Sequence, residues 1–378
     1  MIEIYQPNLN NIEKKLLIKS FKKNHISSYG INTKIFENIF SRKYNFKNNF
    51  VVNSGTSALQ IALLASGVSK NDLVITQSYS FAATSNAILN CGAKPWFFDI
   101  SKDNFSLNLD QLETILKKKT YIKNNELFHK KTNQKISAIL PVFSIGILID
   151  VKRIKKIAKK YKIEVIFDAA AAHGCINFFK KNLNDSFFCF SFNGNKTLTS
   201  GSGGIICNDK SNKNKKIMKL INVGKGKKKY RYDLSGYNFR PSNLLSAIGI
   251  GQVSRINEIL KKKNKIFKFY SSNLDNSKFL KQYCKEDTIP WLYFILLKKN
   301  ISSKFFQHIK NKKINLDYFW SPLNLNKPYK NYLCENLSNT NYIWRKILIL
   351  PSHTNLNKKK LDYIKKQIVE ALKFYKLI

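Results

Sequence analysis

Short apolar runs alternate with helix-like segments between about residues 50 and 210. The runs have the length and the bounding residues of strands, and the segments between them place apolar residues at helical spacing. Strands separated by helices in this way indicate parallel strands joined by crossovers. We therefore predict an α/β fold around a mostly parallel sheet that is covered on both faces. The predicted strands are FVVN (50–53), DLVITQ (72–77), KPWFFDI (94–100), ISAILPVF (136–143), IEVIFDA (163–169), FFCFSF (187–192) and GGIICN (203–208).

The last two predicted strands have little helix between them, so we expect the sheet to end in differently connected strands. After about residue 242 the pattern changes to a long helix followed by alternating strands and helices. We predict a large α/β domain at 1–245 and a smaller α+β domain at 246–378, with the N-terminal residues 1–20 packing on the small domain. A Lys/Asn-rich loop is expected at 209–216. The later elements are predicted at 242–274, 290–297, 302–313, 347–350 and 361–375.

The formal net charge is +43, from 66 Lys and Arg against 23 Asp and Glu. Such a charge would ordinarily suggest a nucleic-acid-binding protein. Only six of the basic residues are Arg, however, and Arg is the residue that reads bases and phosphates through paired hydrogen bonds. The chain is also rich in Asn, Ile, Phe and Tyr, as an AT-rich coding bias would produce. We therefore expect no specific nucleic-acid partner, although the positive field would attract an anionic substrate.

Hydrophobic residues form 43% of the 378-residue chain, which is enough for a buried core. The start, MIEIYQPNLNNIEKK, lacks the apolar stretch of a signal peptide, and no later segment is apolar for long enough to cross a bilayer. The six cysteines are scattered, without a CxxC pair or partnering histidines. We expect reduced, mostly buried thiols, no metal site, no membrane insertion and a cytoplasmic location.

Two segments carry chemistry at predicted strand ends. NSGTSAL (53–59) follows a strand and opens a helix, so its backbone N–H groups could hold an anion, with hydroxyl donors from Thr56 and Ser57. An ordinary helix cap is the alternative. Asp168 ends the strand 163–169, at the edge where ligands bind in open α/β sheets. It could pair with a protonated pyridine nitrogen, or it could cap the helix that follows.

Lys196 is the one lysine between residues 182 and 209. It lies in CFSFNGNKTLTSGSGG (189–204), after a strand and before a glycine-rich turn. Desolvation and a neighbouring cation there would lower the pKa of its amine, as an amine nucleophile requires. Ser191, five residues earlier, could donate a hydrogen bond to a phosphate. A further segment, SGYNFRPSN (235–243), is either an anion-contacting loop or a plain connection.

These segments, in this order, resemble the DegT/DnrJ family of sugar aminotransferases, which are fold-type I enzymes dependent on pyridoxal 5′-phosphate (PLP). The resemblance extends from near residue 25 to the C-terminus. It implies a fold-type I PLP transferase with a mostly parallel sheet in its large domain and a smaller C-terminal α+β domain. It rests on NSGTSALQIAL, QSYSFAATSNAIL, PVFSIG, FDAAAAHG, SFNGNKTLTSGSGG, GYNFRPSNLLSAIGIGQ and ILPSHTNL.

The resemblance also implies roles for individual residues. Lys196 would form a Schiff base with PLP and then move a proton between the cofactor and the substrate. Asp168 would bind the pyridine nitrogen, and Phe81 would stack on the ring. Asn238 would reach the phosphate of the neighbouring subunit's cofactor, which implies a homodimer with shared active sites. The residues implied to hold the phosphate are Gly55, Thr56, Ser57 and Ser191.

The implied reaction moves an amino group from glutamate to a nucleotide-linked keto-sugar in surface-glycan biosynthesis, including polysaccharide and lipopolysaccharide. SFNGNK and the ending ILPSHTNL are most similar to members that aminate UDP-linked 4-keto-6-deoxy amino sugars. Two residues depart from the family pattern. Ala171 stands where Gln or Glu is frequent, and Ser202 interrupts the glycine-rich turn. Both departures bear on cofactor tuning and on the choice of substrate.

Three alternatives remain open at this point. A PLP-dependent sugar dehydratase of the same fold would carry His in place of Lys196. A DNA- or RNA-binding protein would account for the positive charge. A non-catalytic homologue with an interaction or regulatory role would account for Ala171 and Ser202.

Overall fold

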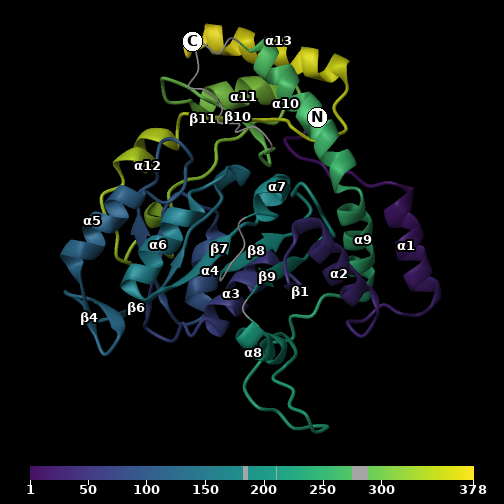
Figure 1. The fold of residues 1–378 in the computed structure, drawn as a ribbon. Coiled ribbons are helices and arrows are strands. Elements are labelled where there is room, and N and C mark those ends of the chain that lie inside the picture. The colour runs from purple at the N-terminus through teal and green to yellow at the C-terminus, as the bar shows by residue number, and fades with distance from the viewer. Residues whose placement is uncertain (182–185, 210, 275–287) are drawn as a thin grey trace.

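The computed structural model describes residues 1–181, 186–209, 211–274 and 288–378. Within them the chain forms a large sheet surrounded by helices and a second sheet of two antiparallel strands (Figure 1). The strands of the large sheet are β1 (Asn48–Val52), β2 (Leu73–Gln77), β3 (Lys94–Phe98), β4 (Thr120–Lys123), β5 (Glu126–His129), β6 (Lys135–Leu140), β7 (Glu164–Asp168), β8 (Phe187–Ser191) and β9 (Gly204–Asn208).

The large sheet follows the order β1-β9-β8-β7-β6-β2-β3, with β5 pairing to β6 and β4 to β5. The strands β3, β2, β6, β7 and β8 are parallel, which confirms the predicted α/β fold and its mostly parallel sheet. The strand β9 runs antiparallel between β8 and β1. The predicted change from parallel to differently connected strands is therefore present at β8 and β9. These two strands do not end the sheet, however, because β1 pairs with the other side of β9.

The helices are α1 (Asn11–Lys22), α2 (Asn32–Tyr44), α3 (Gly55–Ala65), α4 (Ala82–Asn90), α5 (Leu109–Lys119), α6 (Val151–Tyr161), α7 (Ile176–Phe179), α8 (Ser211–Ile221), α9 (Asn243–Ser254), α10 (Ile256–Asn273), α11 (Ser303–Asn311), α12 (Ser338–Ile343) and α13 (Lys358–Phe374). Several begin at a polar side chain that accepts a hydrogen bond from the first turn. Ser54 does so for α3, Asn108 for α5 and Asp150 for α6. Such caps stabilise a helix start by about 1 kcal/mol each.

Helices cover both faces of the large sheet, as the alternating pattern predicts. On one face α2, α5 and α6 pack into a core that includes Phe40 and Phe167. On the other face α3 and α4 pack into a core that includes Ile61 and Ile166. The neighbours Ile166 and Phe167 on β7 belong to different cores because successive strand residues point to opposite faces. The ends of the parallel strands are thereby fixed between two packed layers.

The second sheet consists of β10 (Tyr293–Leu296) and β11 (Ile347–Leu350). The helices α10, α11 and α13 pack on it, and all of them lie above the large sheet in Figure 1. The N-terminal residues reach this part of the chain, where the Ile2 backbone N–H donates to the Lys313 carbonyl at 2.7 Å. The division of the chain into domains at residue 245 stays a prediction.

Two predicted elements are wrong in detail. The long helix at 242–274 is two helices, α9 and α10, which meet at Arg255. The Arg255 guanidinium binds Glu13 and Glu258 there, so the break coincides with a buried contact to α1. The expected loop at 209–216 contains the first six residues of α8, which begins at Ser211. Its apolar residues, including Ile217, pack beneath α3, and this tertiary contact outweighs its Lys/Asn-rich start.

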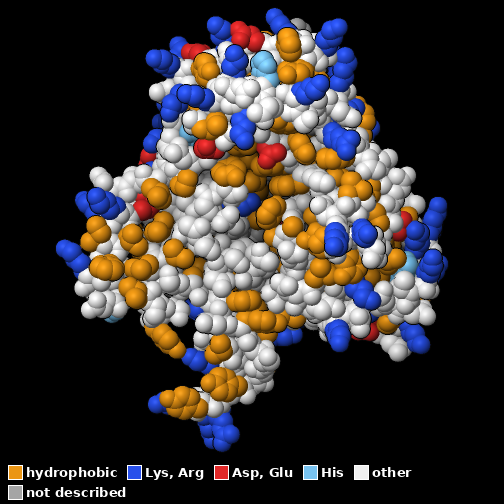
Figure 2. Space-filling model, turned by 180° about the vertical axis from the view of Figure 1, so that it is seen from behind, with side chains coloured by type: hydrophobic (Ala, Val, Ile, Leu, Met, Phe, Trp, Pro, Cys, Tyr) orange, Lys and Arg blue, Asp and Glu red, His pale blue; other side chains and the backbone are white. Residues whose placement is uncertain are grey.

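The charge is spread over the surface. On the face in Figure 2, Lys and Arg lie mainly around the edge, and the hollow near the centre is lined mostly by hydrophobic and uncharged atoms. Within the described ranges, no helix combines the length and apolarity needed to span a bilayer. Those same ranges contain no group of three or more His, Cys, Asp or Glu placed to hold a metal ion. Cys284 lies outside the described residues; the described cysteines are free, with Cys334 exposed and the others, Cys91, Cys175, Cys189 and Cys207, buried.

Candidate active site

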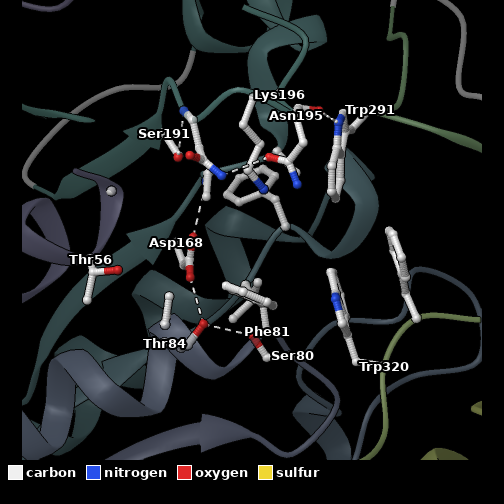
Figure 3. Close-up of a pocket in the computed structure, with 18 of the residues that line it drawn as sticks. Thr56, Ser80, Phe81, Thr84, Asp168, Ser191, Asn195, Lys196, Trp291 and Trp320 are labelled. Carbon is white, nitrogen blue, oxygen red and sulfur yellow. Dashed lines mark hydrogen bonds between the residues drawn. The ribbon is translucent and has the colours of Figure 1, made fainter. Parts of the chain in front are cut away.

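A cavity of about 530 Å³ lies at the carboxyl ends of the parallel strands (Figure 3). This is the edge at which open α/β sheets bind ligands. The segments that line it include the β1–α3 turn, the start of α4, residues 142–143 after β6, the end of β7, the turns after β8, and residues 5, 291 and 317–321. Six of the residues predicted from sequence line this one cavity: Gly55, Thr56, Phe81, Asp168, Ser191 and Lys196.

The turn between β1 and α3 is a candidate anion cradle. Ser54 Oγ accepts a hydrogen bond from the Ser57 N–H at 3.0 Å. Among the described residues, the N–H groups of Gly55 and Thr56 have no protein acceptor, so the first turn of α3 leaves them for an anion. Gly55 is required by the close approach of β8, since a Cβ on it would lie 2.8 Å from the Cβ of Ser191. The Ser191 hydroxyl thereby lies beside the cradle.

Asp168 is the last residue of β7 and is only 4% exposed. Its Oδ2 accepts a hydrogen bond from Thr84 Oγ1 at 2.7 Å, and its Oδ1 accepts one from the Ala170 N–H at 3.1 Å. The Thr84 hydroxyl is in turn 2.7 Å from that of Ser80. Burial raises the pKa of Asp168, while the two hydrogen bonds act in the opposite direction. A buried carboxylate held in this way is suited to a cationic partner in the cavity.

Lys196 lies in the turn after β8, with its Nζ 4.0 Å from the centre of the Trp291 ring. Trp291 Nε1 donates to the carbonyl of Asn195 at 2.7 Å, which fixes the ring beside the lysine. Burial lowers the pKa of Lys196 from 10.5 to about 8, and the Asp168 charge partly opposes this shift. Far more of this amine is therefore unprotonated near neutral pH than of an exposed lysine, as a nucleophile requires.

Aromatic rings form one wall of the cavity. Trp291 stacks on Phe319 at 5.7 Å between ring centres, and Phe319 stacks on Trp320 at 5.3 Å. Phe81 is 58% exposed and projects into the same space (Figure 3). A cavity with an apolar wall and a few placed polar groups is the usual form of a small-molecule site.

The remaining predicted residues lie outside the cavity lining. Ser57 is buried, and its hydroxyl is 2.8 Å from that of Ser54. It therefore contacts the turn without lining the cavity. Asn238 is exposed and lies on the loop before α9. The two residues that depart from the family pattern, Ala171 and Ser202, both line the cavity. The Ser202 hydroxyl donates to the carbonyl of Asn53 at 2.7 Å, next to the anion cradle.

Sequence reasoning missed several residues of the site. Thr84 and Ser80 hold Asp168, and their spacing of four residues across the start of α4 was a readable signal inside the segment QSYSFAATSNAIL. Trp291 and Trp320 lie far along the chain from Lys196. Trp291 falls in the element predicted at 290–297, but nothing in either segment indicates a contact with Lys196. Only the tertiary fold brings them to the cavity.

The cavity fits PLP, the group that the sequence resemblance implies. An anion cradle, a buried carboxylate and an amine of lowered pKa lie around one space, and they match the phosphate, the pyridine nitrogen and the aldehyde of that cofactor. The absent Cβ of Gly55 leaves the backbone accessible at the cradle. The fold and the site thus define a PLP-dependent aminotransferase.

Comparison with known families leads to the same class. Residues 7–369 match the model of the DegT/DnrJ/EryC1/StrS aminotransferase family. The chain belongs to this family and is an enzyme, a PLP-dependent sugar aminotransferase.

Individual relatives support the assignment. The chain is 31% identical over 276 residues to a protein of Vibrio cholerae named GDP-perosamine synthase, covering 72% of this chain and 71% of the relative. It is 30% identical to a protein of Campylobacter jejuni named UDP-4-amino-4,6-dideoxy-N-acetyl-beta-L-altrosamine transaminase, covering 98% of both chains. Among solved structures, Spr1654 of Streptococcus pneumoniae in its PMP form has a TM-score of 0.87 at 21% identity, covering 99% of both chains.

Proposed function

We propose that this aminotransferase moves an amino group from glutamate to a nucleotide-linked keto-sugar in surface-glycan biosynthesis. The observation that carries the proposal is the placement of Lys196 and Asp168 in one cavity beside an anion cradle. The relatives named for GDP- and UDP-linked sugars support a nucleotide-sugar acceptor.

Lys196 is the proposed reactive amine. Its lowered pKa, about 8, leaves part of it as the free base that can bind the aldehyde of PLP. Bound PLP supplies an electron sink for the negative charge that develops at the substrate carbon. With the cofactor bound, the Lys196 amine would take up and return a proton at Nζ, as a general acid and base. The Trp291 ring keeps this amine on one side of the cavity.

Asp168 and the β1–α3 turn are the proposed anchors of the cofactor. Asp168 holds the pyridine nitrogen in its charged form, and Thr84 keeps the carboxylate in place. Gly55, Thr56 and Ser191 bind the phosphate, with Ser57 supporting the turn from behind, and Phe81 covers the ring. These contacts would hold the cofactor within reach of the Lys196 amine.

The nucleotide of the acceptor is UDP or GDP in this proposal. The similarity of the segments SFNGNK and ILPSHTNL to other family members favours a UDP-linked 4-keto-6-deoxy amino sugar. The V. cholerae relative, in contrast, is named for a GDP-linked sugar. Lys and Arg around the face in Figure 2 would attract either diphosphate.

A homodimer with shared sites is also part of the proposal. Asn238 is exposed, and the segment between α8 and α9 projects away from the rest of the chain in Figure 1. Its tip carries Tyr230 and Tyr232, which are 79% and 59% exposed. A second copy would cover these rings and receive Asn238 at its phosphate cradle. The free, mostly buried cysteines favour the proposed cytoplasmic location.

The test combines purified protein, PLP and glutamate with a panel of UDP- and GDP-linked 3-keto and 4-keto sugars. Formation of 2-oxoglutarate together with an amino-sugar nucleotide supports the proposal, and the sugar that reacts fastest identifies the acceptor. Consumption of glutamate without amination of any sugar in the panel would overturn the proposed acceptor class. The Lys196→Met variant serves as the control, because it keeps the length of the side chain and removes the amine.

A further inference from the structure

Trp291 connects separate parts of the chain at the wall of the cavity. It lies just before β10, and its backbone N–H donates to the carbonyl of Ile145, in the turn after β6, at 2.7 Å. Its indole Nε1–H donates to the carbonyl of Asn195 at 2.7 Å. The residue is only 3% exposed. Its backbone and its ring are thus held by two different segments, and the second of these carries Lys196.

Aromatic neighbours fix the tilt of the Trp291 ring. The ring of Phe319 lies at 27° to it with the centres 5.7 Å apart, and the ring of Tyr5 lies at 25° with the centres 6.4 Å apart. A buried ring held by a hydrogen bond and by two nearly parallel neighbours has little freedom to turn. The face that it presents to Lys196 is therefore a fixed part of the cavity wall.

The amine of Lys196 lies over this face, with Nζ 4.0 Å from the ring centre (Figure 3). At this distance the electron-rich face of an indole attracts an ammonium group, whereas it has no comparable attraction for a neutral amine. Burial acts in the opposite direction, because it lowers the pKa of Lys196 to about 8. The ring therefore favours the charged form of an amine that its surroundings otherwise disfavour.

We propose that Trp291 is a positioning residue for Lys196: its ring face stabilises the ammonium form of that amine, and its indole N–H fixes the backbone next to it. The inference rests on the proposed role of Lys196 as the reactive amine. In that role Lys196 takes up a proton at Nζ and later returns it. The ring retains the amine at the wall while it is charged, and it leaves the neutral amine free to move toward a bound aldehyde.

Two titratable groups face Lys196 from the end of β7 and the segment after it. Asp168 favours the charged form of the lysine, so it acts in the same direction as the ring. His173 is fully buried, and burial lowers its pKa to about 4, so the imidazole is neutral near pH 7.

Other titratable groups approach from the remaining elements. Lys263 on α10 donates to the backbone carbonyl of Trp291 at 2.7 Å. Asp317 and Tyr5 line the same cavity as Lys196. All of these groups stay in place when only the electron density of the Trp291 ring is changed. Such a change therefore isolates the effect of the ring on the lysine.

Replacement of Trp291 by a fluorinated tryptophan makes this change. Fluorine withdraws electron density from the ring face but keeps the ring and its N–H, so burial and the bond to Asn195 remain. The pKa of Lys196 is measured in the full-length, cofactor-free protein, from the pH dependence of acetylation by trace acetic anhydride and mass analysis of the Lys196 peptide. We expect its inflection to move down by about 0.5–1 pH unit. An unchanged inflection would overturn the proposal.

The same replacement at Trp344 is the matched control. The ring of Trp344 also has a cation over it, with the Arg345 guanidinium carbon 4.4 Å from the ring centre, but this tryptophan does not line the cavity. We expect the inflection of Lys196 to stay where it is in the wild type. Equal shifts from the two positions would show that contact with the ring is not the cause, and the proposal would fail.

Trp291→Phe and Trp291→Leu carry the test to the reaction. Both variants lack the indole N–H, and only Phe keeps a ring face. In single turnovers of the PLP-loaded protein with glutamate, we expect a loss of about threefold for Phe and about tenfold or more for Leu. Equal losses would assign the effect to the bond with Asn195 and refute the role of the ring. If neither variant folds, the fluorinated protein, which keeps every contact, decides the question.

These outcomes are separate from the test of the acceptor. The inflection of Lys196 is measured without cofactor or sugar, so a protein that aminates no sugar in the panel can still show the shift. In that case the proposed acceptor is wrong and the role of Trp291 stands. Amination of a sugar without any shift of the inflection on fluorination of Trp291 gives the reverse result, and it would leave the reaction in place while overturning the inference.

Discussion

Thr84 Oγ1 donates a 2.7 Å hydrogen bond to Oδ2 of Asp168, which joins the first turn of α4 to the end of β7. Both residues are buried, and both line the cavity. A hydrogen bond to a charged group contributes about 1.5–3 kcal/mol, and the Ala170 N–H alone cannot hold both carboxylate oxygens. The orientation of Asp168 therefore depends on a residue that no strand-end pattern indicates.

Replacement of Thr84 by Val should slow transamination about tenfold or more, because the carboxylate loses one of its two donors. The KM for glutamate should change little, since Thr84 is placed on the cofactor side of the site. Steady-state kinetics with glutamate measures both the rate and the KM. The variant Thr84→Ser keeps the hydroxyl and should recover most of the rate; equal losses in Val and Ser variants would contradict this account.

Asp168→Asn should retain the fold and the hydrogen bond from Thr84 while removing the negative charge. We expect both half-reactions to slow by about 100-fold or more, the size typical of removing one electrostatic contact in an active site. Single-turnover measurements with glutamate on the PLP form and with the keto-sugar nucleotide on the pyridoxamine phosphate form separate the two halves. Near-normal rates in either half would show that the charge of Asp168 is not needed.

Gly55→Ala should weaken PLP binding about tenfold or more, because the new Cβ would lie 2.8 Å from Ser191 Cβ and force the cradle apart. The double variant Gly55→Ala, Ser191→Gly removes the clashing atom and should bind PLP more tightly than Gly55→Ala alone. Equilibrium titration of cofactor-free protein measures these affinities. If the second substitution gives no recovery, close contact with Ser191 is not the reason for the glycine.

The lowered pKa of Lys196 predicts how stability changes with pH. The pKa is about 8 in the folded protein and 10.5 in the unfolded chain, so between these pH values the unfolded chain binds more protons at this residue. The free energy of unfolding therefore rises with pH across this range. Cofactor-free Lys196→Met should therefore exceed the wild type in free energy of unfolding below about pH 8, and the difference should shrink toward pH 10.5. Urea unfolding at several pH values measures this. A difference that is constant with pH would mean that the amine is not desolvated.

The shared-site proposal predicts complementation between two inactive proteins. Lys196→Met lacks the amine, and Asn238→Asp places a negative charge where the partner's phosphate would lie. Mixed dimers contain one site with an intact Lys196 and an intact Asn238 from the other chain, so activity should return after the two are mixed and allowed to exchange subunits. Persistent inactivity in dimers shown to be mixed would place Asn238 outside the partner's site.

Much of the fold could be predicted from sequence because its strands are buried on both faces. Such strands read as continuous apolar runs, and the helices between them carry one apolar face, so β7 and α6 stand out. The break between α9 and α10 could not be predicted, since Arg255 interrupts an unbroken helical pattern only through its contact with Glu13. The start of α8 could not be predicted either, because its Lys/Asn-rich composition does not indicate that the helix packs beneath α3.

The predicted site residues differ in how well the structure gathers them. Residues at or shortly after strand ends, such as Asp168 and Lys196, line one cavity because strand ends meet at one edge of the sheet. Trp291 reaches that cavity from the C-terminal part of the chain, through a contact with Asn195 that no spacing in the sequence specifies. Its position depends on tertiary structure alone.

The central claim is that Lys196, one of many lysines in this chain, is the amine that binds PLP. Reduction of the PLP-loaded protein with borohydride fixes the bond between the lysine and the cofactor, and peptide mass analysis then locates it. The account predicts a single phosphopyridoxyl group on the peptide that contains Lys196, and no such group on any other lysine. A label on another lysine, or an equal label in Lys196→Met, would contradict it.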